Sequence, residues 1–85
     1  DEAFPAVELA KSVGRAGATF PAVYNAANEQ AVEAFHEGRL GFLGIVDTVR
    51  AVVDLHESPQ ELTVETLAEA EAWARRTADR LIAAE

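Results

Sequence analysis

One pair of side chains in this chain has a metal-binding spacing. Glu33 and His36 stand three residues apart, as in the Glu-x-x-His pairs of di-iron carboxylate bundles. Such a site needs a second pair, but the residue three positions before the other histidine, His56, is Val53. His36 also falls opposite the apolar stripe of its predicted helix. We therefore interpret the pair as solvated, with a small metalloenzyme bundle as the weaker alternative.

His56 is a second candidate for chemistry. It falls on the apolar side of the last turn of a predicted helix, where histidine can interact with free carbonyls and the negative helix end. No recognisable motif places a nucleophile beside it, so we interpret it as structural rather than as a catalytic base. The turns GRAG and GRLG lack the context of a phosphate-binding loop, because no predicted strand precedes either, and they indicate helix ends.

Asn25 and Asn28 raise a different question, because asparagine competes for the backbone and is only a moderate helix former. Both stand in an alanine-rich segment that otherwise predicts an amphipathic helix. On a helical wheel they share with Val32 a second stripe beside the main apolar one. Three interpretations stay open: Asn25 caps a helix, both amides are solvated, or both pack against a loop or a neighbouring domain. Asn25, Asn28 and Val32 are thus our candidate domain-docking or loop-bridging residues.

The elements that must position these residues are four predicted helices, each with apolar residues recurring at about 100° per residue. Pro21 suits a first helical turn, Gly38 a helix end, and Thr63 an N-cap. The residue before Pro59 resists helical geometry, which ends the third helix. The helices span approximately residues 5–14, 21–37, 42–57 and 64–84, and a short helix before a longer one is an alternative near residues 67–70.

Each helix has a predicted core face. In the first it holds Ala6, Leu9, Ala10 and Val13, and in the second Phe20, Val23, Tyr24, Ala27, Ala31, Ala34 and Phe35. In the third it holds Phe42, Ile45, Val46, Val49, Val52 and Val53, and in the fourth Leu67, Ala70, Ala74, Thr77, Ala78 and Leu81, flanked by Trp73 and Ile82. We expect Phe35 to be central, Trp73 to be a packing residue, and Glu71 to pair with Arg75. Short connections favour antiparallel neighbours, so the predicted fold is all-α: one up-and-down four-helix bundle over residues 1–85.

Composition narrows the class of function. The 85 residues carry 15 acidic and 7 basic side chains, a net charge of −8, which disfavours nucleic acid and acidic lipid surfaces. The absence of cysteine excludes a disulfide scaffold and fits a cytoplasmic protein. No apolar run is long enough to span a membrane. Because the chain lacks methionine and begins Asp-Glu-Ala-Phe, we expect it to be a piece of a longer polypeptide.

The central motifs resemble a known family. The stretches "FPAVELA", "AGATFPAVYNAANEQAVEAFHEGRLGF" and "IVDTV" closely resemble the C-terminal helical domain of the 1-deoxy-D-xylulose 5-phosphate reductoisomerases, actinobacterial members in particular. The resemblance covers essentially the whole chain, and the last segment matches mainly in its amphipathic pattern. Two departures are minor: Ala18 stands where a second glycine is common in the family, and Gln30 replaces a frequent glutamate.

The resemblance implies a part of an enzyme rather than an enzyme. The family uses NADPH and Mg²⁺ or Mn²⁺ to convert deoxyxylulose phosphate to methylerythritol phosphate in non-mevalonate isoprenoid biosynthesis. Its first domain binds NADPH, and its middle domain holds the metal ligands, the substrate contacts and the dimer interface. None of the family's catalytic motifs matches this chain, so no catalytic, cofactor-binding or metal-binding residue is carried over. The expected role is structural support of the catalytic domain in the same polypeptide, with a free-standing helical interaction module as the alternative.

Overall fold

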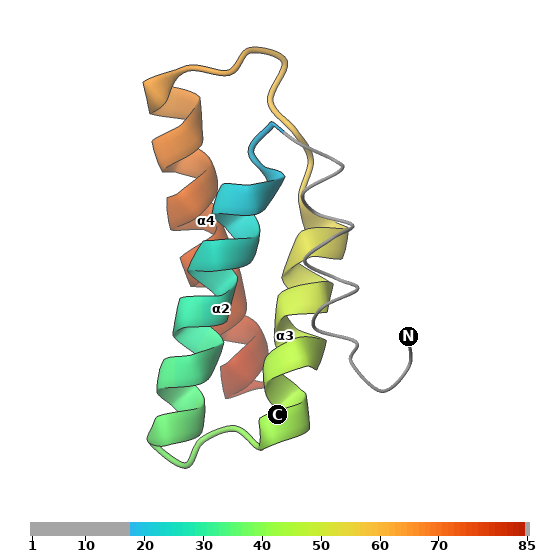
Figure 1. The fold of residues 1–85 in the computed structure, drawn as a ribbon, viewed down its shortest axis with the longest axis vertical. Coiled ribbons are helices and arrows are strands. Elements are labelled where there is room, and N and C mark those ends of the chain that lie inside the picture. The colour runs from blue at the N-terminus through green and yellow to red at the C-terminus, as the bar shows by residue number, and fades with distance from the viewer. Residues whose placement is uncertain (1–17, 85) are drawn as a thin grey trace.

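The computed structural model describes residues 18–84, and the regular elements within this range are three helices. They are α2 (Phe20–His36), α3 (Phe42–Leu55) and α4 (Val64–Ala83) (Figure 1). The all-helical class is confirmed, and the predicted bounds differ most at the end of α3, which is Leu55 rather than residue 57. The predicted helix over residues 5–14 lies outside the described residues, so a four-helix bundle is not confirmed.

Local sequence explains where α2 ends and where α4 begins. Gly38, with φ +77°, follows α2, and the Arg39 N–H donates to the Ala34 carbonyl at 2.9 Å. This is the 6→1 hydrogen bond of a Schellman motif, for which glycine is the favoured residue. At the start of α4, Thr63 Oγ1 accepts from the Thr66 N–H at 3.0 Å, and Thr66 Oγ1 accepts from the Thr63 N–H at 2.8 Å. This reciprocal cap starts one continuous helix, so the alternative of a break near residues 67–70 is wrong.

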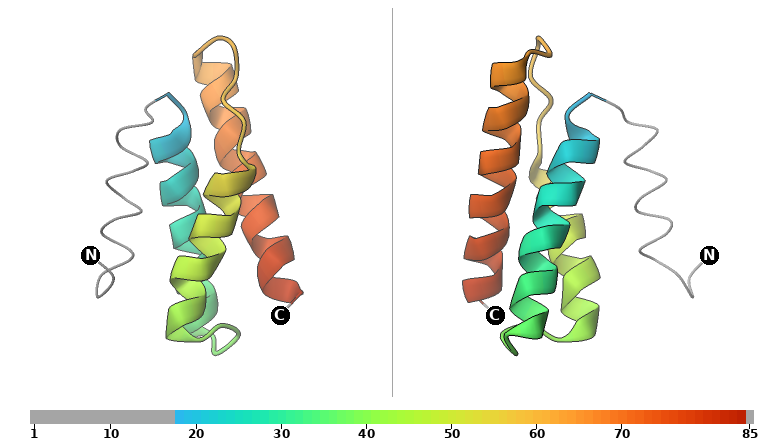
Figure 2. Two further views of the ribbon diagram at one scale, coloured as in Figure 1. Left: turned by 90° about the vertical axis from the view of Figure 1, so that its right-hand side faces the viewer. Right: turned by 60° about the vertical axis from the view of Figure 1, so that its left-hand side comes forward.

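In Figure 1 the three helices run down, up and down, so that consecutive helices are antiparallel. Helix α2 packs extensively on both α3 and α4, whereas α3 and α4 contact each other less. The two further views show the same order, with α2 next to both partners (Figure 2). A helix packed on two sides must bury more than one narrow stripe, and Ala26 of α2 is accordingly buried although it lies outside the predicted stripe.

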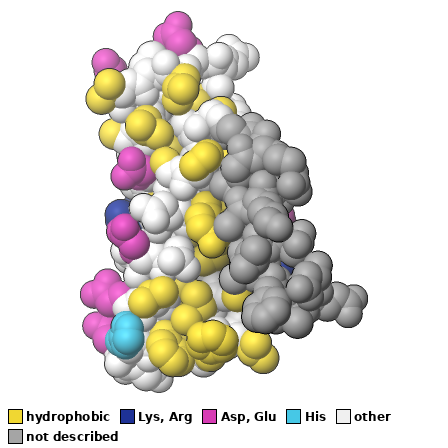
Figure 3. Space-filling model, in the orientation of Figure 1, with side chains coloured by type: hydrophobic (Ala, Val, Ile, Leu, Met, Phe, Trp, Pro, Cys, Tyr) yellow, Lys and Arg dark blue, Asp and Glu magenta, His cyan; other side chains and the backbone are white. Residues whose placement is uncertain are grey.

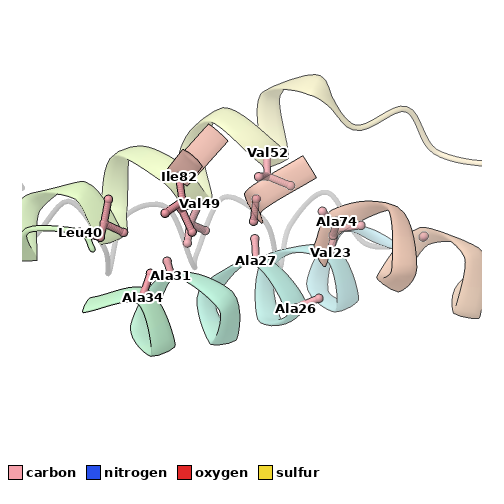
Figure 4. Close-up of a cluster of buried hydrophobic side chains, with 12 residues drawn as sticks. Val23, Ala26, Ala27, Ala31, Ala34, Leu40, Val49, Val52, Ala74 and Ile82 are labelled. Atoms are coloured by element: carbon pink, nitrogen blue, oxygen red, sulfur yellow. The ribbon is translucent and has the colours of Figure 1, made fainter. Parts of the chain in front are cut away.

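Small side chains line the contact between the helices. Ala27, Ala31 and Ala34 of α2 are completely buried, and they face Val49, Val52 and Ile82 across the core (Figure 4). Alanine lets two helix axes approach closely, which suits a chain with few large apolar residues. The buried apolar residues of the described range are Val23, Ala26, Ala27, Ala31, Ala34, Leu40, Val49, Val52, Ala70, Ala74, Ala78 and Ile82.

Two aromatic residues predicted for the core are not there. Phe35 is 37% exposed and Phe42 is 70% exposed, so the prediction that Phe35 is central is wrong. Both lie at the end of the bundle where α2 turns into α3, and no helix of residues 18–84 covers them fully there. Leu40, in the connecting turn, is buried instead. Periodicity alone could not detect this, because both residues fall on the apolar side of their helices.

None of the helices in residues 18–84 is long and apolar enough to cross a membrane.

Candidate functional site

An open groove runs along the outer face of α2 and contains two of the three predicted docking residues. Its lining consists of Asn28, Glu29, Val32, Glu33, His36 and Glu37. Asn28 and Val32 are half-buried in it, one turn apart. The groove therefore offers an amide and an apolar side chain on one surface, bordered by carboxylates. Such a surface can make directional hydrogen bonds to another segment of protein.

The structure separates the two asparagines that the sequence placed together. Asn25 is exposed, does not line the groove, and directs its Nδ2 toward Glu29 Oε2 at a long 3.4 Å. Asn25 lies inside α2, which begins at Phe20 with Thr19 as N-cap, so the interpretation of Asn25 as a helix cap is wrong. Among the described residues, no hydrogen-bond partner is present for the Asn28 side chain. The Asn28 amide therefore makes no side-chain hydrogen bond within the described part of the chain.

Glu33 and His36, the pair with metal-binding spacing, both line this groove. Both are exposed. Residues 18–84 contain no group of three or more histidine or acidic side chains that could hold a metal ion. In the described part of the chain the two side chains form part of the polar border of the groove.

A network of polar side chains connects α2 to α4. Gln30 Nε2 donates to Asp79 Oδ1 at 2.7 Å, Arg75 Nη1 donates to Gln30 Oε1 at 2.9 Å, and Arg75 Nη2 donates to Glu29 Oε1 at 2.8 Å. Arg75 thus pairs across the helix interface, and the predicted pairing with Glu71 is wrong. Sequence offered no signal for this network, because its members are about half the chain apart. The network holds Glu29, one wall of the groove, in place.

His56 is the centre of a second cluster, built from all three described helices. Its Nε2 lies 2.6 Å from Oγ1 of Thr19, which is completely buried at the start of α2. Its ring lies edge-on to Phe20, with centroids 4.8 Å apart, and 5.4 Å from the Trp73 ring of α4. Burial lowers the pKa of His56 below its ordinary value of 6.5, and the Glu57 carboxylate opposes this shift. His56 and Trp73 thus pack together where the three described helices meet, and the structural interpretation of His56 stays a prediction.

An open cleft lies beside this cluster, between the end of α3 and the first turns of α4. It is lined by Leu55, His56, Glu57, Pro59, Thr66, Glu69, Ala70 and Trp73. At the wall of this cleft, His56 bonds Thr19 through Nε2 and packs against the rings of Phe20 and Trp73. The cleft and the groove lie on different elements and do not share a residue.

A third surface, which sequence reasoning missed, is apolar. Phe35, Phe42 and Leu43 are 37%, 70% and 74% exposed where α2 turns into α3, and the Phe35 and Phe42 rings meet edge-to-face at 6.0 Å. In the space-filling view, hydrophobic side chains gather at this end of the molecule (Figure 3). The Phe35 ring also contacts His36, at 5.7 Å between centroids. The apolar surface is therefore continuous with the groove of α2.

Comparison with known proteins adds a family to this geometry. Residues 1–77 match the family model described as the DXP reductoisomerase C-terminal domain. The chain is similar to proteins named 1-deoxy-D-xylulose 5-phosphate reductoisomerase: 69% identical over 81 residues to that of Leifsonia xyli, covering 95% of this chain and 22% of that protein. It is 62% identical over 80 residues to that of Paenarthrobacter aurescens, covering 93% of this chain and 20% of that protein. It is 58% identical over 86 residues to that of Kitasatospora griseola, covering 98% of this chain and 22% of that protein. The chain thus spans about a fifth of the length of the curated relatives it matches.

Proposed function

Because this chain belongs to the family of DXP reductoisomerase C-terminal domains, we propose that it is the C-terminal support domain of a 1-deoxy-D-xylulose 5-phosphate reductoisomerase. The observation that carries the proposal is the match over residues 1–77, together with 69% identity to a reductoisomerase. In this proposal the reaction itself takes place outside these 85 residues. The remaining part of the polypeptide binds NADPH and Mg²⁺ or Mn²⁺, and it converts deoxyxylulose phosphate to methylerythritol phosphate.

The proposal includes a complete architecture for the domain. A helix over residues 5–14 would join α2, α3 and α4 in one up-and-down four-helix bundle that spans residues 1–85. Support comes from the sequence, where Ala6, Leu9, Ala10 and Val13 recur at helical spacing after Pro5.

The partner of the domain is the catalytic part of the same polypeptide, in a homodimeric cytoplasmic enzyme. Asn28 and Val32 would contact that part directly, since they lie side by side in an open groove. Asn25 is exposed and donates a long hydrogen bond to Glu29. It would lie at the edge of the contact. An amide suits such a border, because it donates and accepts hydrogen bonds without a charge to desolvate.

The test begins with the complete gene and the polypeptide it encodes. We expect a dinucleotide-binding domain upstream of these residues and NADPH-dependent turnover of deoxyxylulose phosphate in the presence of Mg²⁺. The polypeptide without these 85 residues should lose most of that turnover, through lost stability rather than a lost catalytic group. A gene that encodes no upstream enzyme, or a complete polypeptide without turnover, would refute the proposal and favour a free-standing helical interaction module.

A further inference from the structure

Three large apolar side chains share one end of the bundle, where they face solvent. We call Phe35, Phe42 and Leu43 the apolar end patch; they are 37%, 70% and 74% exposed. Hydrophobic side chains gather at the lower end of the space-filling view, the end at which α2 turns into α3 (Figure 3). Single exposed apolar residues are ordinary, but adjoining ones that include aromatic rings mark an interaction surface. We therefore expect another protein segment to cover the apolar end patch.

The turn beneath the patch is held in one conformation. The Arg39 N–H and the Gly38 N–H donate to the Ala34 and Phe35 carbonyls, which closes the end of α2. Leu40 points inward and is 6% exposed. A Cβ on Gly44 would lie 2.6 Å from Leu40 Cδ1, so Leu40 occupies the space that the glycine leaves open. The turn between the two phenylalanines thus has a buried leucine and a hydrogen-bonded backbone, which reduces the backbone entropy that docking would cost.

The residues around the apolar end patch indicate the chemistry of the surface that would cover it. His36 joins the patch to the groove that contains Asn28, Val32 and Glu33. An apolar centre with a polar, solvent-accessible border is the usual anatomy of a protein interface. Of the three carboxylates along the groove, Glu29 and Glu37 pair with Arg75 and Arg39. Glu33 has no arginine partner in the described part of the chain, so a complementary surface would offer it a lysine or arginine beside apolar side chains.

We propose that the apolar end patch is the anchor by which this domain packs against the remainder of its own polypeptide, on an apolar segment bordered by basic residues. The inference rests on the proposed function, since the reductoisomerase relatives have about four fifths of their length outside the matched part. It adds the contact surface and the chemistry of the partner segment. A second copy of the chain is the competing occupant, and the experiment separates the two.

The first measurement is thiol labelling in the complete polypeptide. This segment has no cysteine of its own, so Leu43→Cys places one thiol on the patch, and mass mapping of the peptides identifies it. The matched control is Ala72→Cys, on the exposed face of α4 with Glu69 and Arg76. Relative to each variant's rate after denaturation, we expect position 43 to label about tenfold more slowly than position 72. Equal rates would overturn the proposal.

The second measurement identifies what covers the patch. The photoreactive residue p-benzoyl-phenylalanine replaces Phe42 in the complete polypeptide, which is then irradiated and digested. We expect cross-links from position 42 to peptides outside the 85 residues, in a species that keeps the mass of one subunit. A cross-linked species of twice the subunit mass would overturn the proposal in favour of a second copy, and so would an absence of cross-links.

Failure of this inference is distinguishable from failure of the proposed function. Turnover by the unmodified polypeptide decides whether it is a reductoisomerase, and it does not depend on the position of Leu43. Labelling and cross-linking decide where the domain docks, and they do not depend on turnover. An active enzyme with a freely labelled Leu43→Cys would retain the function and reject the patch.

Discussion

Thr19 and His56 join the start of α2 to the end of α3 by a hydrogen bond of 2.6 Å between Oγ1 and Nε2. The residues are 37 positions apart, and Thr19 is completely buried. Thr19 occupies the N-cap position of α2, but its side chain makes no capping hydrogen bond. Its hydroxyl serves the tertiary contact instead.

We predict that Thr19→Val destabilises the domain by about 1 kcal/mol, because valine keeps the volume of threonine and loses the hydrogen bond to His56. Urea unfolding of the 85-residue chain, followed by circular dichroism, measures the change. Thr77→Val is a matched control. Its hydroxyl is also buried, but it has no hydrogen-bond partner in the described part of the chain. The same substitution there should leave stability unchanged or raise it by about 1 kcal/mol. Equal losses would show that the Thr19 hydroxyl contributes nothing specific.

We also predict that the domain loses stability as the pH falls through the unfolded-state value of about 6.5. Burial lowers the pKa of His56 in the folded chain, so the unfolded chain binds a proton more readily and is favoured at lower pH. The contribution of neutral His56 is therefore fully present above pH 6.5 and declines below it. The Glu57 carboxylate raises the pKa of His56 against the effect of burial, so the decline is smaller than burial alone would produce.

The measurement is the free energy of unfolding at neutral and mildly acidic pH. The variant His56→Gln should lose part of the pH dependence. His36→Gln, which removes an exposed imidazole and keeps His56, is the control and should retain it. An unchanged slope in His56→Gln would show that burial of this ring does not control the transition.

Ala18 provides a third prediction, because its φ of +52° lies in the left-handed region that alanine rarely adopts. Alanine pays about 1–2 kcal/mol for this conformation, whereas glycine adopts it freely but has more entropy to lose. We expect Ala18→Gly to raise the free energy of unfolding by about 0.5–1 kcal/mol. Ala72→Gly, at an exposed position inside α4, should lower it by about 1 kcal/mol. A loss at both positions would show that residue 18 is not strained.

A fourth prediction follows from the positions of two large apolar residues. Ile82 is 4% exposed inside the core, so Ile82→Ala should cost about 2–5 kcal/mol of stability. Phe35 lies at the rim of the core, so Phe35→Ala in the 85-residue chain should lower the free energy of unfolding by less than Ile82→Ala does. The loss should also be smaller than the loss of about 3–5 kcal/mol expected for a central phenylalanine. Denaturant midpoints of the two variants, measured side by side, give the comparison. A larger loss for Phe35→Ala would return that residue to the core.

The fifth prediction concerns the groove of α2. If Asn28 bonds to the catalytic part, Asn28→Ala should destabilise the complete enzyme by about 1–3 kcal/mol, because buried partners lose their hydrogen bonds. The loss in the 85-residue chain should be much smaller. Asn25→Ala is the control, and we expect little change in either protein, since Asn25 is exposed. A full loss in the 85-residue chain would point to an internal loop, and no loss in either protein would place both asparagines in solvent.

Sequence by itself determined the local features of this protein. The bounds of α2, α3 and α4 followed from apolar periodicity and from Pro21, Gly38 and Thr63, which act on the backbone within a turn or two of their own position. The family followed from contiguous motifs, which need no structure to be read. Most buried residues followed too, because a helix that packs on neighbours must bury its apolar face.

Tertiary structure alone decided which side chains meet and how far the core extends. Phe35 and Phe42 have the right periodicity for burial, yet they lie at the end of the bundle, where no described helix reaches over them. Thr19 forms a hydrogen bond with His56, and Arg75 donates to Glu29 rather than to Glu71 of its own helix. Both bonds form because helix packing brings distant positions within hydrogen-bond range. Periodicity fixes the direction of a side chain about its helix axis, but only the packed arrangement sets what lies in that direction.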